Sequence, residues 1–471
     1  MNNIKKTKIV CSIGPASTAP EVMSQMVNAG MNVARINFSH ATPEEKIAVV
    51  NSVHKVREMT GKNVAILYDT KGPEFRNGMV EGEGINLVEG KTIRMVKETV
   101  VGNEERFSVN HPQAIDNLEV GSIVLLENGL MKIQVISVED DGVTCKIING
   151  GVLGNKKSLN APGVKLDIPF ISDVDREDII YACEHEGDYI ALSFVSCKED
   201  VLEAREILKQ YNREDMKVIS KIESTTGVDN LDSIIDVSDG IMVARGDLGV
   251  EVPMQQLPKY QKLMIQKCRE KGKIVIVATE MLESMKKSAR PTRAEVSDVA
   301  NAVLDGTDAV MLSGETTIGK FPVEVVRYMA EICKDTEEYY DYDYEFDSVR
   351  EITITETIAS SCVNAVSVLG VDLIIAATVS GYTAKVISNL KPRCLILAAT
   401  SDEKVARSLA LNYGVYPVIV PELDSIDEVI ALAKEKAKEV MGVTEGDIVA
   451  ITGGFPKNGA KTTNFLKIDQ M

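Results

Sequence analysis

The sequence predicts an α/β protein in which a (β/α)8 barrel carries an inserted small β-barrel domain and is followed by a C-terminal α/β domain. Eight short segments rich in Val, Ile and Ala alternate with helix-like stretches up to about residue 313, and this alternation is typical of a parallel sheet. A long stretch with β-type alternation interrupts the pattern after the third segment. With 471 residues, the chain is also long enough for two to four domains.

The eight segments are the expected barrel strands, and their apolar runs are continuous because parallel strands are covered on both faces. They lie at residues 7–13, 32–37, 64–69, 188–194, 217–222, 240–245, 273–279 and 308–313. Helical periodicity is found between them at 42–59, 198–211, 258–272 and 291–305. Polar residues follow the strands, at the end of such a barrel where active sites are built.

The domain boundaries follow from where this periodicity changes. Residues 77–160 alternate in β fashion with Gly and Asn-Gly turns, so we assign them to the inserted β domain. Residues 1–76 and 161–344 form the barrel. The α/β pattern starts again with a small-residue helix at 356–370, so residues 345–471 form a third, five-stranded domain.

Composition limits the possible partners. The formal net charge is -18, which would repel a nucleic acid or an anionic membrane, so any bound phosphate should be small and held in a local basic pocket. The chain has no apolar run near 18 residues and no apolar N-terminal signal region. Eight scattered cysteines without a C-x-x-C pair, and only four histidines, favour a reduced compartment without a zinc site. We expect a soluble cytoplasmic protein.

The segment VISKIES at 218–224 places two opposite charges in an apolar strand. Residues two apart in a strand share a face, so Lys221 and Glu223 should project together into the barrel mouth. Taken alone, the pair is more often an ordinary ion pair at a strand end. In the next unit, VARGDLG places Asp247 beyond a strand end. Two carboxylates from adjacent strands suit Mg²⁺, although a plain Gly-Asp turn is the alternative.

Two other strand ends supply cationic and oxygen groups. Arg35 and Arg76, in VARINFSH and DTKGPEFR, suit phosphate oxygens, although each alone could be structural. Oxygen donors that could converge on a monovalent cation are Asn37, Ser39, Asp69 and Thr70.

Glycine-rich segments do not predict a conventional nucleotide loop, because neither IGPAS nor GGVLGNKK fits a P-loop or a G-x-G-x-x-G motif. Lys156 and Lys157 could reach phosphates across a cleft, or be surface lysines. In the third domain, the segment TVSGYTAK follows a strand and begins a helix. Its hydroxyls and backbone N–H groups at the helix N-terminus suit a phosphate. The alternative is a plain N-cap. Lys457 and Lys461 lie in a later glycine-rich loop that could close over such a ligand.

Seven ordered motifs resemble those of the pyruvate kinase family. They are TKIVCSIGPAS, GMNVARINFSHAT, DTKGPEFR, SKIES, DGIMVARGDLGVE, ATEMLESM and RPTRAEVSDVANAVLDGTDAVMLSGET. The resemblance covers residues 7 to about 335, is looser in the insert and continues as a pattern to residue 471. It implies phosphoryl transfer from phosphoenolpyruvate to ADP, giving pyruvate and ATP, in a cytoplasmic homotetramer. The sequence shows no match to the extra C-terminal domain of some bacterial relatives.

The resemblance also implies roles for individual residues. Arg35 and Lys221 would hold the phosphoryl group, Glu223 and Asp247 would bind Mg²⁺ or Mn²⁺, and Lys221 would neutralise charge on the phosphoryl group and the enolate. Gly246, Asp247 and Thr279 would bind the substrate, with Thr279 acting through water near the carbon that is protonated. The implied potassium ligands are Asn37, Ser39, Asp69 and Thr70.

The nucleotide and effector sites implied by the resemblance lie elsewhere. The residues facing the nucleotide would be Asn37, Phe38, Ser39, His40, Arg76 and Lys157. A sugar phosphate such as fructose 1,6-bisphosphate would bind at Ser380, Gly381, Tyr382 and Thr383. Relatives with a glutamate at the position of Glu74 tend to need potassium, whereas those with lysine supply the charge themselves.

The sequence departs from the family pattern at two places, and two rival functions stay open. Glu280 replaces the glutamine of the usual ATQML motif, and Glu127-Asn128 stands where relatives often have paired aspartates. A metal-dependent aldolase or lyase could use the same barrel and metal without needing Arg76, Lys157 or ADP. A non-catalytic regulatory relative would lose key groups, and none of them is lost here.

Overall fold

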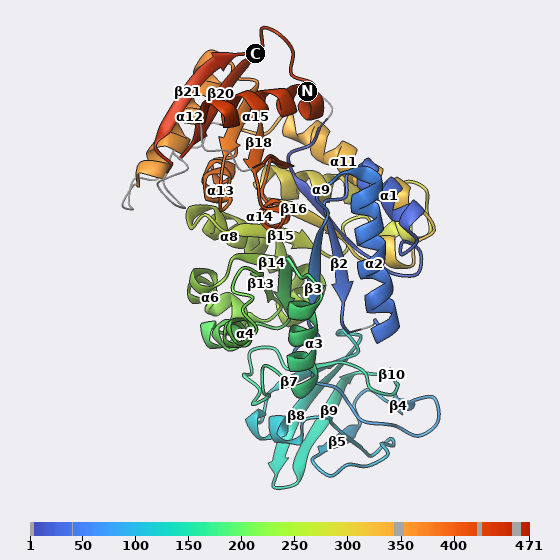
Figure 1. Cartoon of the computed structure of the whole chain (residues 1–471). Coiled ribbons are helices and arrows are strands. Elements are labelled where there is room, and N and C mark those ends of the chain that lie inside the picture. The colour runs from blue at the N-terminus through green and yellow to red at the C-terminus, as the bar shows by residue number, and fades with distance from the viewer. Residues whose placement is uncertain (1–3, 40, 343–352, 422–425, 455–462) are drawn as a thin grey trace.

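The structure is a computed structural model that describes residues 4–39, 41–342, 353–421, 426–454 and 463–471. Figure 1 shows three parts in a row, with the inserted β domain at the bottom, the barrel in the middle and the third domain at the top. The ends of the chain lie close together at the top of this view (Figure 1).

The barrel closes with the eight strands predicted from the sequence, all paired in parallel. The strand order is β1-β16-β15-β14-β13-β12-β3-β2, so β12 lies between β3 and β13. The bounds are β1 (Lys8–Ser12), β2 (Val33–Asn37), β3 (Ala65–Asp69), β12 (Tyr189–Leu192), β13 (Lys217–Ile222), β14 (Gly240–Ala244), β15 (Ile274–Ala278) and β16 (Ala309–Leu312).

Helices cover the outside of the barrel, and three of the long ones begin with a capping box, at Thr42, Ser172 and Thr292. The helices are α1 (Pro20–Ala29), α2 (Pro43–Thr60), α3 (Asp173–Glu184), α4 (Lys198–Gln210), α5 (Thr225–Asp229), α6 (Leu231–Val237), α7 (Arg245–Glu251), α8 (Leu257–Glu270), α9 (Arg293–Leu304), α10 (Gly314–Thr317) and α11 (Pro322–Glu337). Short 3-10 turns are found at Met254–Gln256 and Glu283–Lys286.

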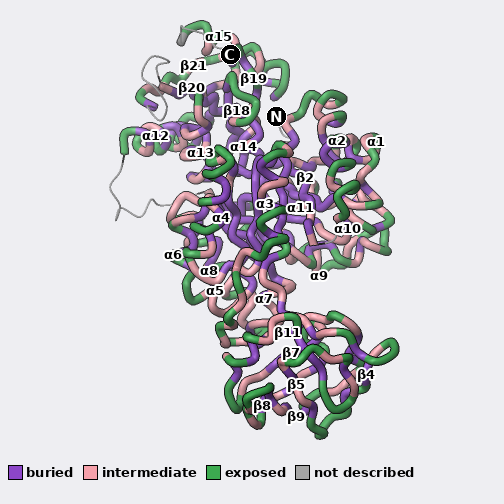
Figure 2. The backbone as a smooth tube through the Cα atoms, turned by 60° about the horizontal axis from the view of Figure 1, so that its bottom comes forward, coloured by how far each residue is buried: buried purple, intermediate pink, exposed green. Residues whose placement is uncertain are grey.

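Strand alternation separates two apolar layers, as the sequence predicted for 218–224. Val218 and Ile222 pack in the large cluster between strands and helices, whereas Ile219 belongs to the cluster inside the barrel. Figure 2 shows the buried backbone concentrated in the barrel and in the sheet of the third domain. The face of β13 that carries Ile219 therefore points Lys221 into the barrel.

The inserted domain has its own apolar cluster, which includes Phe107 and Ile133. Its strands form a six-stranded sheet and a separate two-stranded sheet, not one closed ring. They are β4 (Ile85–Leu87), β5 (Thr92–Val96), β6 (Arg106–Ser108), β7 (Ile123–Leu126), β8 (Met131–Glu139), β9 (Gly142–Asn149), β10 (Gly151–Leu153) and β11 (Leu159–Asn160), with a 3-10 turn at Pro112–Asn117.

The third domain has the five strands expected, in the order β19-β18-β17-β20-β21, with β21 antiparallel to β20. Its elements are α12 (Ile354–Leu369), β17 (Leu373–Ala377), α13 (Tyr382–Asn389), β18 (Leu395–Thr400), α14 (Glu403–Ser408), β19 (Val415–Ile419), α15 (Ile426–Met441), β20 (Ile448–Gly453) and β21 (Phe465–Gln470).

The third domain closes the amino end of the barrel. Leu411 is fully buried in the apolar cluster inside the barrel. Around it, Arg407 Nε lies 2.9 Å from Asp188 Oδ1, and Lys391 forms an ion pair with Asp308. These buried ion pairs fix the third domain at the barrel end opposite the polar strand ends.

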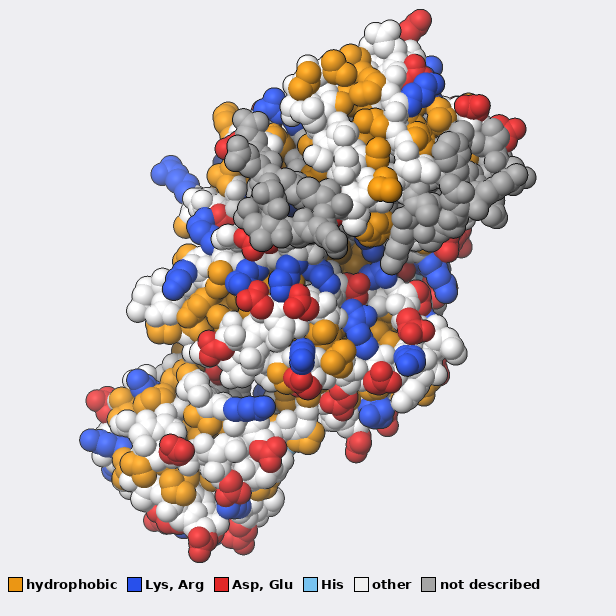
Figure 3. All heavy atoms as spheres, turned by 90° about the vertical axis from the view of Figure 1, so that its left-hand side faces the viewer, with side chains coloured by type: hydrophobic (Ala, Val, Ile, Leu, Met, Phe, Trp, Pro, Cys, Tyr) orange, Lys and Arg blue, Asp and Glu red, His pale blue; other side chains and the backbone are white. Residues whose placement is uncertain are grey.

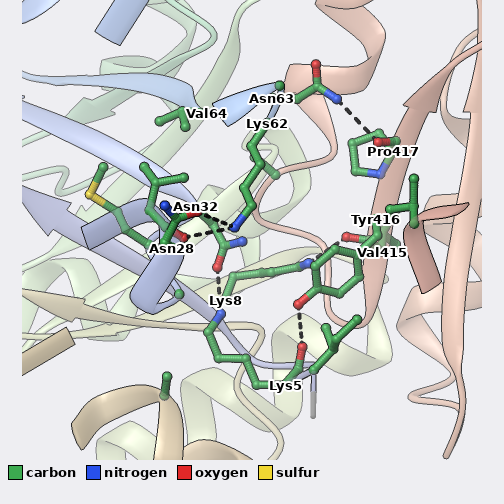
Figure 4. Close-up of a pocket in the computed structure, with 18 of the residues that line it drawn as sticks. Lys5, Lys8, Asn28, Asn32, Lys62, Asn63, Val64, Val415, Tyr416 and Pro417 are labelled. Atoms are coloured by element: carbon green, nitrogen blue, oxygen red, sulfur yellow. Dashed lines mark hydrogen bonds between the residues drawn. The ribbon is translucent and has the colours of Figure 1, made fainter. Parts of the chain in front are cut away.

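A cavity of about 920 Å³ also lies at this junction (Figure 4). The ammonium of Lys8 donates to the Val415 carbonyl over 2.5 Å and lies 3.8 Å from the centre of the Tyr416 ring. The Tyr416 hydroxyl in turn donates to the Lys5 carbonyl over 2.6 Å. Lys8 therefore joins the first barrel strand to the third domain across the cavity wall.

Acidic side chains are spread over the face in Figure 3, with Lys and Arg between them, so this face offers no large uniformly basic surface. Among the described residues, no helix has the length and apolar character needed to cross a membrane.

Candidate functional site

Lys221 lies buried at the carboxyl end of β13, with its ammonium between two carboxylates, one at the end of β3 and one at the end of β13. Its Nζ is 3.1 Å from Glu223 Oε1 and 3.1 Å from Asp69 Oδ1. Burial lowers the pKa of a lysine, but the charges of Asp69 and Glu223 outweigh it, so the pKa of Lys221 lies above its usual value. The ammonium is therefore held charged in a site that excludes most water.

Asp69 links this lysine to Arg35. The carboxylate is fully buried and accepts from Arg35 Nε over 2.6 Å as well as from Lys221. Burial alone would raise the pKa of Asp69, but the two cations lower it below its usual value. Arg35 also donates to Ser12 Oγ over 2.7 Å. Arg35 and Lys221, which the sequence placed on the phosphoryl group, are therefore brought together by one carboxylate.

Glu223 has too little positive charge around it. It is 1% exposed, and Phe194 N–H donates to its Oε2 over 2.7 Å. Burial raises the pKa of Glu223, and so do the negative charges of Asp247 and Asp69. The charge of Lys221 lowers it, but the net result is a pKa of about 7. A divalent cation beside Glu223 and Asp247 would relieve this repulsion, so the donor set fits the Mg²⁺ or Mn²⁺ predicted from the sequence. The described residues contain no cluster of three or more His, Cys, Asp or Glu suited to a metal.

Thr279 occupies a strained backbone position just beyond β15. Its φ is 68°, which a β-branched residue rarely adopts. Its hydroxyl accepts from Gly246 N–H over 2.8 Å and donates to the Ala278 carbonyl over 2.6 Å. Arg245 donates to the Thr279 carbonyl over 2.7 Å and to Asp298 over 2.7 Å. The structure thus brings Gly246 and Thr279 together and holds the strained turn in place with a buried arginine.

The expected ligands of the monovalent cation lie at the ends of β2 and β3. Asn37 and Asp69 are paired in register on these neighbouring strands, and Thr70 follows directly. Asn37 Oδ1 accepts from Ser39 N–H over 3.1 Å. Phe38 is buried and stacks on Tyr68 with ring centres 5.1 Å apart. His40 lies outside the described residues.

A cleft lies between the inserted domain and the barrel, and its lining includes Arg76, one of the residues expected to face the nucleotide. A cavity of about 670 Å³ there is bounded by Arg76, Asn128 and Ser158 on one side and by Asp247 and Glu251 on the other. Its edge is already bridged, because Asn160 Nδ2 donates to Glu251 Oε1 over 3.0 Å. The cleft therefore has the carboxylate of Asp247 and the guanidinium of Arg76 in its lining.

Both basic residues expected to contact the nucleotide are paired with carboxylates. Arg76 makes two bonds to Glu74, over 2.9 and 2.7 Å, and Lys71 lies 3.3 Å from the same carboxylate. Burial alone would raise the pKa of Glu74, but Arg76 and Lys71 outweigh it and lower this pKa below its usual value. Lys157 Nζ lies 2.5 Å from Glu127 Oε1. Lys156 is exposed and contributes its carbonyl, which accepts from Arg76 over 2.8 Å.

The two departures from the family pattern both fall on left-handed backbone. Glu127 and Asn128 have φ values of 48° and 55°, and Glu280 has a φ of 54°. The Ser158 hydroxyl donates a hydrogen bond to Asn128 Oδ1 over 2.8 Å. Glu280 is exposed. Glu127 thus pairs with Lys157, whereas Glu280 is exposed to solvent.

The predicted effector residues lie at the start of α13 in the third domain. Gly381 caps the helix with a φ of 77°, and Thr383 is buried in the first turn. Thr383 Oγ1 lies 2.6 Å from Thr463 Oγ1. This contact brings the chain that follows the glycine-rich loop beside the helix. Lys457 and Lys461 lie outside the described residues.

Two site residues were missed by reasoning from the sequence. Ser193 and Arg245 both follow barrel strands, and both are buried against predicted site residues. Their position just beyond a barrel strand could have marked them as site residues. The serine in LSF and the arginine in VARGD have no spacing to other polar residues that would have distinguished them.

Family models match both large parts of the chain. The model described as "Pyruvate kinase, barrel domain" matches residues 4–326, and "Pyruvate kinase, alpha/beta domain" matches residues 356–469. A pyruvate kinase of Sporosarcina psychrophila is 45% identical over 470 residues, covering 99% of this chain and 80% of that protein. One of Clostridium acetobutylicum is 41% identical over 469 residues, covering 99% of both. The crystal structure of a pyruvate kinase from Cryptosporidium parvum superposes with a TM-score of 0.94 at 40% identity, covering 99% of this chain and 96% of that one.

The raised pKa of Glu223 predicts a pH-dependent metal affinity. A cation binds the ionised carboxylate, and a pKa of about 7 leaves Glu223 mostly ionised at pH 8 and mostly protonated at pH 6. Mn²⁺ should therefore bind about tenfold more weakly at pH 6 than at pH 8. Calorimetric titration of the metal-free protein with Mn²⁺ at both pH values measures this, with Glu251→Gln, another half-buried acid of the cleft, as the control. Equal affinities at pH 6 and pH 8 would contradict the assignment.

Proposed function

The chain belongs to the pyruvate kinase family and transfers the phosphoryl group of phosphoenolpyruvate to ADP, the last step of glycolysis, and we propose that the cluster around Lys221 is where this transfer takes place. The observation that carries the proposal is the buried ammonium of Lys221, which lies 3.1 Å from Asp69 at the end of β3 and 3.1 Å from Glu223 at the end of its own strand. Neither rival function accounts for a chain matched over nearly its full length by these relatives.

Lys221 and Arg35 stabilise the negative charge of the moving phosphoryl group and of the enolate left behind. Both are buried and already oriented by Asp69, so little reorganisation is needed when charge develops. Phosphoryl transfer relies mainly on such positioning and charge stabilisation rather than on covalent chemistry by the protein.

Glu223 and Asp247 are the proposed ligands of the divalent cation. When bound, Mg²⁺ or Mn²⁺ supplies positive charge to the phosphoryl oxygens and orients them. Support comes from the raised pKa of Glu223, which reflects its burial and then the negative charges of Asp247 and Asp69. Thr279 and Gly246 lie on the next strand ends and bind the carboxylate region of phosphoenolpyruvate. Through water, Thr279 assists proton delivery to the enolate carbon.

Asn37, Ser39, Asp69 and Thr70 are the proposed potassium ligands. All offer oxygen atoms, and β2 and β3 place Asn37 and Asp69 side by side. Residues Asn37 to His40, Arg76 and Lys157 are the proposed nucleotide contacts. The cleft of about 670 Å³ beside Arg76 supports this, because it opens between the inserted domain and the helix that carries Asp247.

The enzyme is proposed to be cytoplasmic and to assemble as a homotetramer. All eight cysteines are free, and seven of them are buried, in keeping with a reducing compartment. The side chains of Val368 and Leu369 at the end of α12 are exposed, and a subunit contact would cover them. The acidic net charge disfavours a nucleic acid or membrane partner.

Lys221→Met tests the central assignment. Methionine keeps most of the side-chain volume and removes the charge, so kcat should fall about a thousandfold while the fold and Mn²⁺ binding persist. The measurement is ADP-dependent pyruvate formation from phosphoenolpyruvate with Mg²⁺. Lys217→Met, at the opposite end of the same strand, is the matched control and should stay near the wild-type rate. A Lys221→Met enzyme with near-normal kcat would remove this lysine from the mechanism.

Glu74 generates a prediction about potassium. Wild-type activity should require K⁺, and Glu74→Lys should reduce that requirement because it adds two units of positive charge near the transfer site. Glu74→Gln, which adds only one, should have a smaller effect. The ratio of rates in K⁺ and in tetramethylammonium measures the dependence. Equal wild-type rates in the two salts would refute the prediction.

A sugar phosphate is proposed to activate the enzyme by binding at Ser380 to Thr383 and favouring one subunit arrangement. Fructose 1,6-bisphosphate, ribose 5-phosphate or AMP should lower the half-saturating concentration of phosphoenolpyruvate. Thr383→Glu should abolish this shift by repelling the phosphate, whereas Thr383→Val, which adds no charge, should retain part of it. If none of the three compounds shifts half-saturation, or if Thr383→Glu responds like wild type, α13 begins with an ordinary helix cap.

A further inference from the structure

Ser193 is a buried serine at the centre of the site that neither the sequence motifs nor the proposed roles include. It follows β12, which lies between β3 and β13 in the barrel. Only 2% of its surface is exposed. Its place between two strands puts its hydroxyl between Asp69, at the end of β3, and Lys221, near the end of β13.

The shortest polar contact of the Lys221 ammonium is to this hydroxyl. Lys221 Nζ donates to Ser193 Oγ over 2.7 Å, compared with 3.1 Å to each of the two carboxylates. An ammonium has three protons to donate, and three acceptors surround it. The neutral serine therefore fixes one of the three directions of the ammonium without cancelling any of its charge.

The serine itself is held in a single orientation. Its hydroxyl has one proton, and the shorter of its two acceptor contacts is to the Thr70 carbonyl at 2.7 Å, compared with 3.2 Å to Asp69 Oδ1. Its N–H donates to Thr70 Oγ1 over 3.2 Å. Gly72 packs so closely that a Cβ there would lie 2.8 Å from Ser193 Cβ. With its proton directed at Thr70, the oxygen presents a lone pair to Lys221.

We propose that Ser193 is a positioning residue for phosphoryl transfer, which holds the Lys221 ammonium where it meets the phosphoryl group. This rests on the proposed role of Lys221. Without the hydroxyl, the flexible lysine is held only by Asp69 and Glu223, which attract it by charge and compete with the substrate. Ser193 also ties this lysine to Thr70, so the loop expected to bind potassium and the lysine are positioned together.

Ser193→Ala is the primary test, with pyruvate formation from phosphoenolpyruvate and ADP as the assay. Loss of a hydrogen bond to a charged group predicts a kcat lower by about 10- to 100-fold, with KM values for both substrates within about threefold of wild type, because the group that touches the substrate is still present. Ser220→Ala is the matched control. Ser220 is also fully buried, but its hydroxyl bonds Ser238 at 2.7 Å, on the outer face of β13.

The double variant Ser193→Ala/Lys221→Met separates positioning from a general structural role. If Ser193 acts through Lys221, the double variant should have the same kcat as Lys221→Met alone, because effects of residues that act as one unit are not additive. Should Ser193→Ala fail to fold, Ser193→Cys, similar in shape but a weak acceptor, takes its place with the same expected loss. Near-wild-type kcat in the single variant, or losses that multiply in the double variant, would overturn the proposal. A normal rate in Lys221→Met would instead overturn the assignment of Lys221.

Discussion

The charge of one buried lysine is the constraint on which the rest of the site depends. An ammonium excluded from water is stable only with anionic partners close by, and Lys221 finds them in Asp69 and Glu223, both essentially unexposed. Asp69 lies 152 residues before Lys221 in the sequence. The parallel order β3-β12-β13 brings their carboxyl ends together. The same cluster leaves Glu223 short of positive charge, and this deficit is what a divalent cation would fill.

The other two domains are attached at opposite ends of this barrel. The inserted domain forms a cleft of about 670 Å³ beside Asp247, whereas Leu411 of the third domain fills the amino end. Closing the amino end with buried side chains and ion pairs keeps water away from the barrel interior beneath the site. The polar end borders the cleft, whose edge is bridged by the hydrogen bond from Asn160 to Glu251.

Much of this arrangement could be predicted from the sequence, because strand periodicity and short motifs are local. The eight strands, the five-stranded third domain and the shared inward face of Lys221 and Glu223 all agree with the structure. What could not be predicted depends on contacts between distant segments. The partner of Lys157, Glu127, is 30 residues away, and Ser193 reaches Lys221 only because β12 separates β3 from β13. The positive φ of Thr279 was also hidden, because a β-branched residue gives no local signal for it.

Strand β12 shows how short the connection between the two barrel ends is. At its amino end, Asp188 binds Arg407, and the Tyr189 hydroxyl donates to the Ser408 carbonyl over 2.6 Å. Four residues further along from Tyr189, Ser193 contacts Lys221. A ligand in the third domain can change transfer only if it binds two arrangements of the protein unequally. Because β12 is buried and paired on both sides, it cannot bend freely between those ends. We therefore expect β12 to keep its shape in any such arrangements, with Ser193 held in place relative to Tyr189.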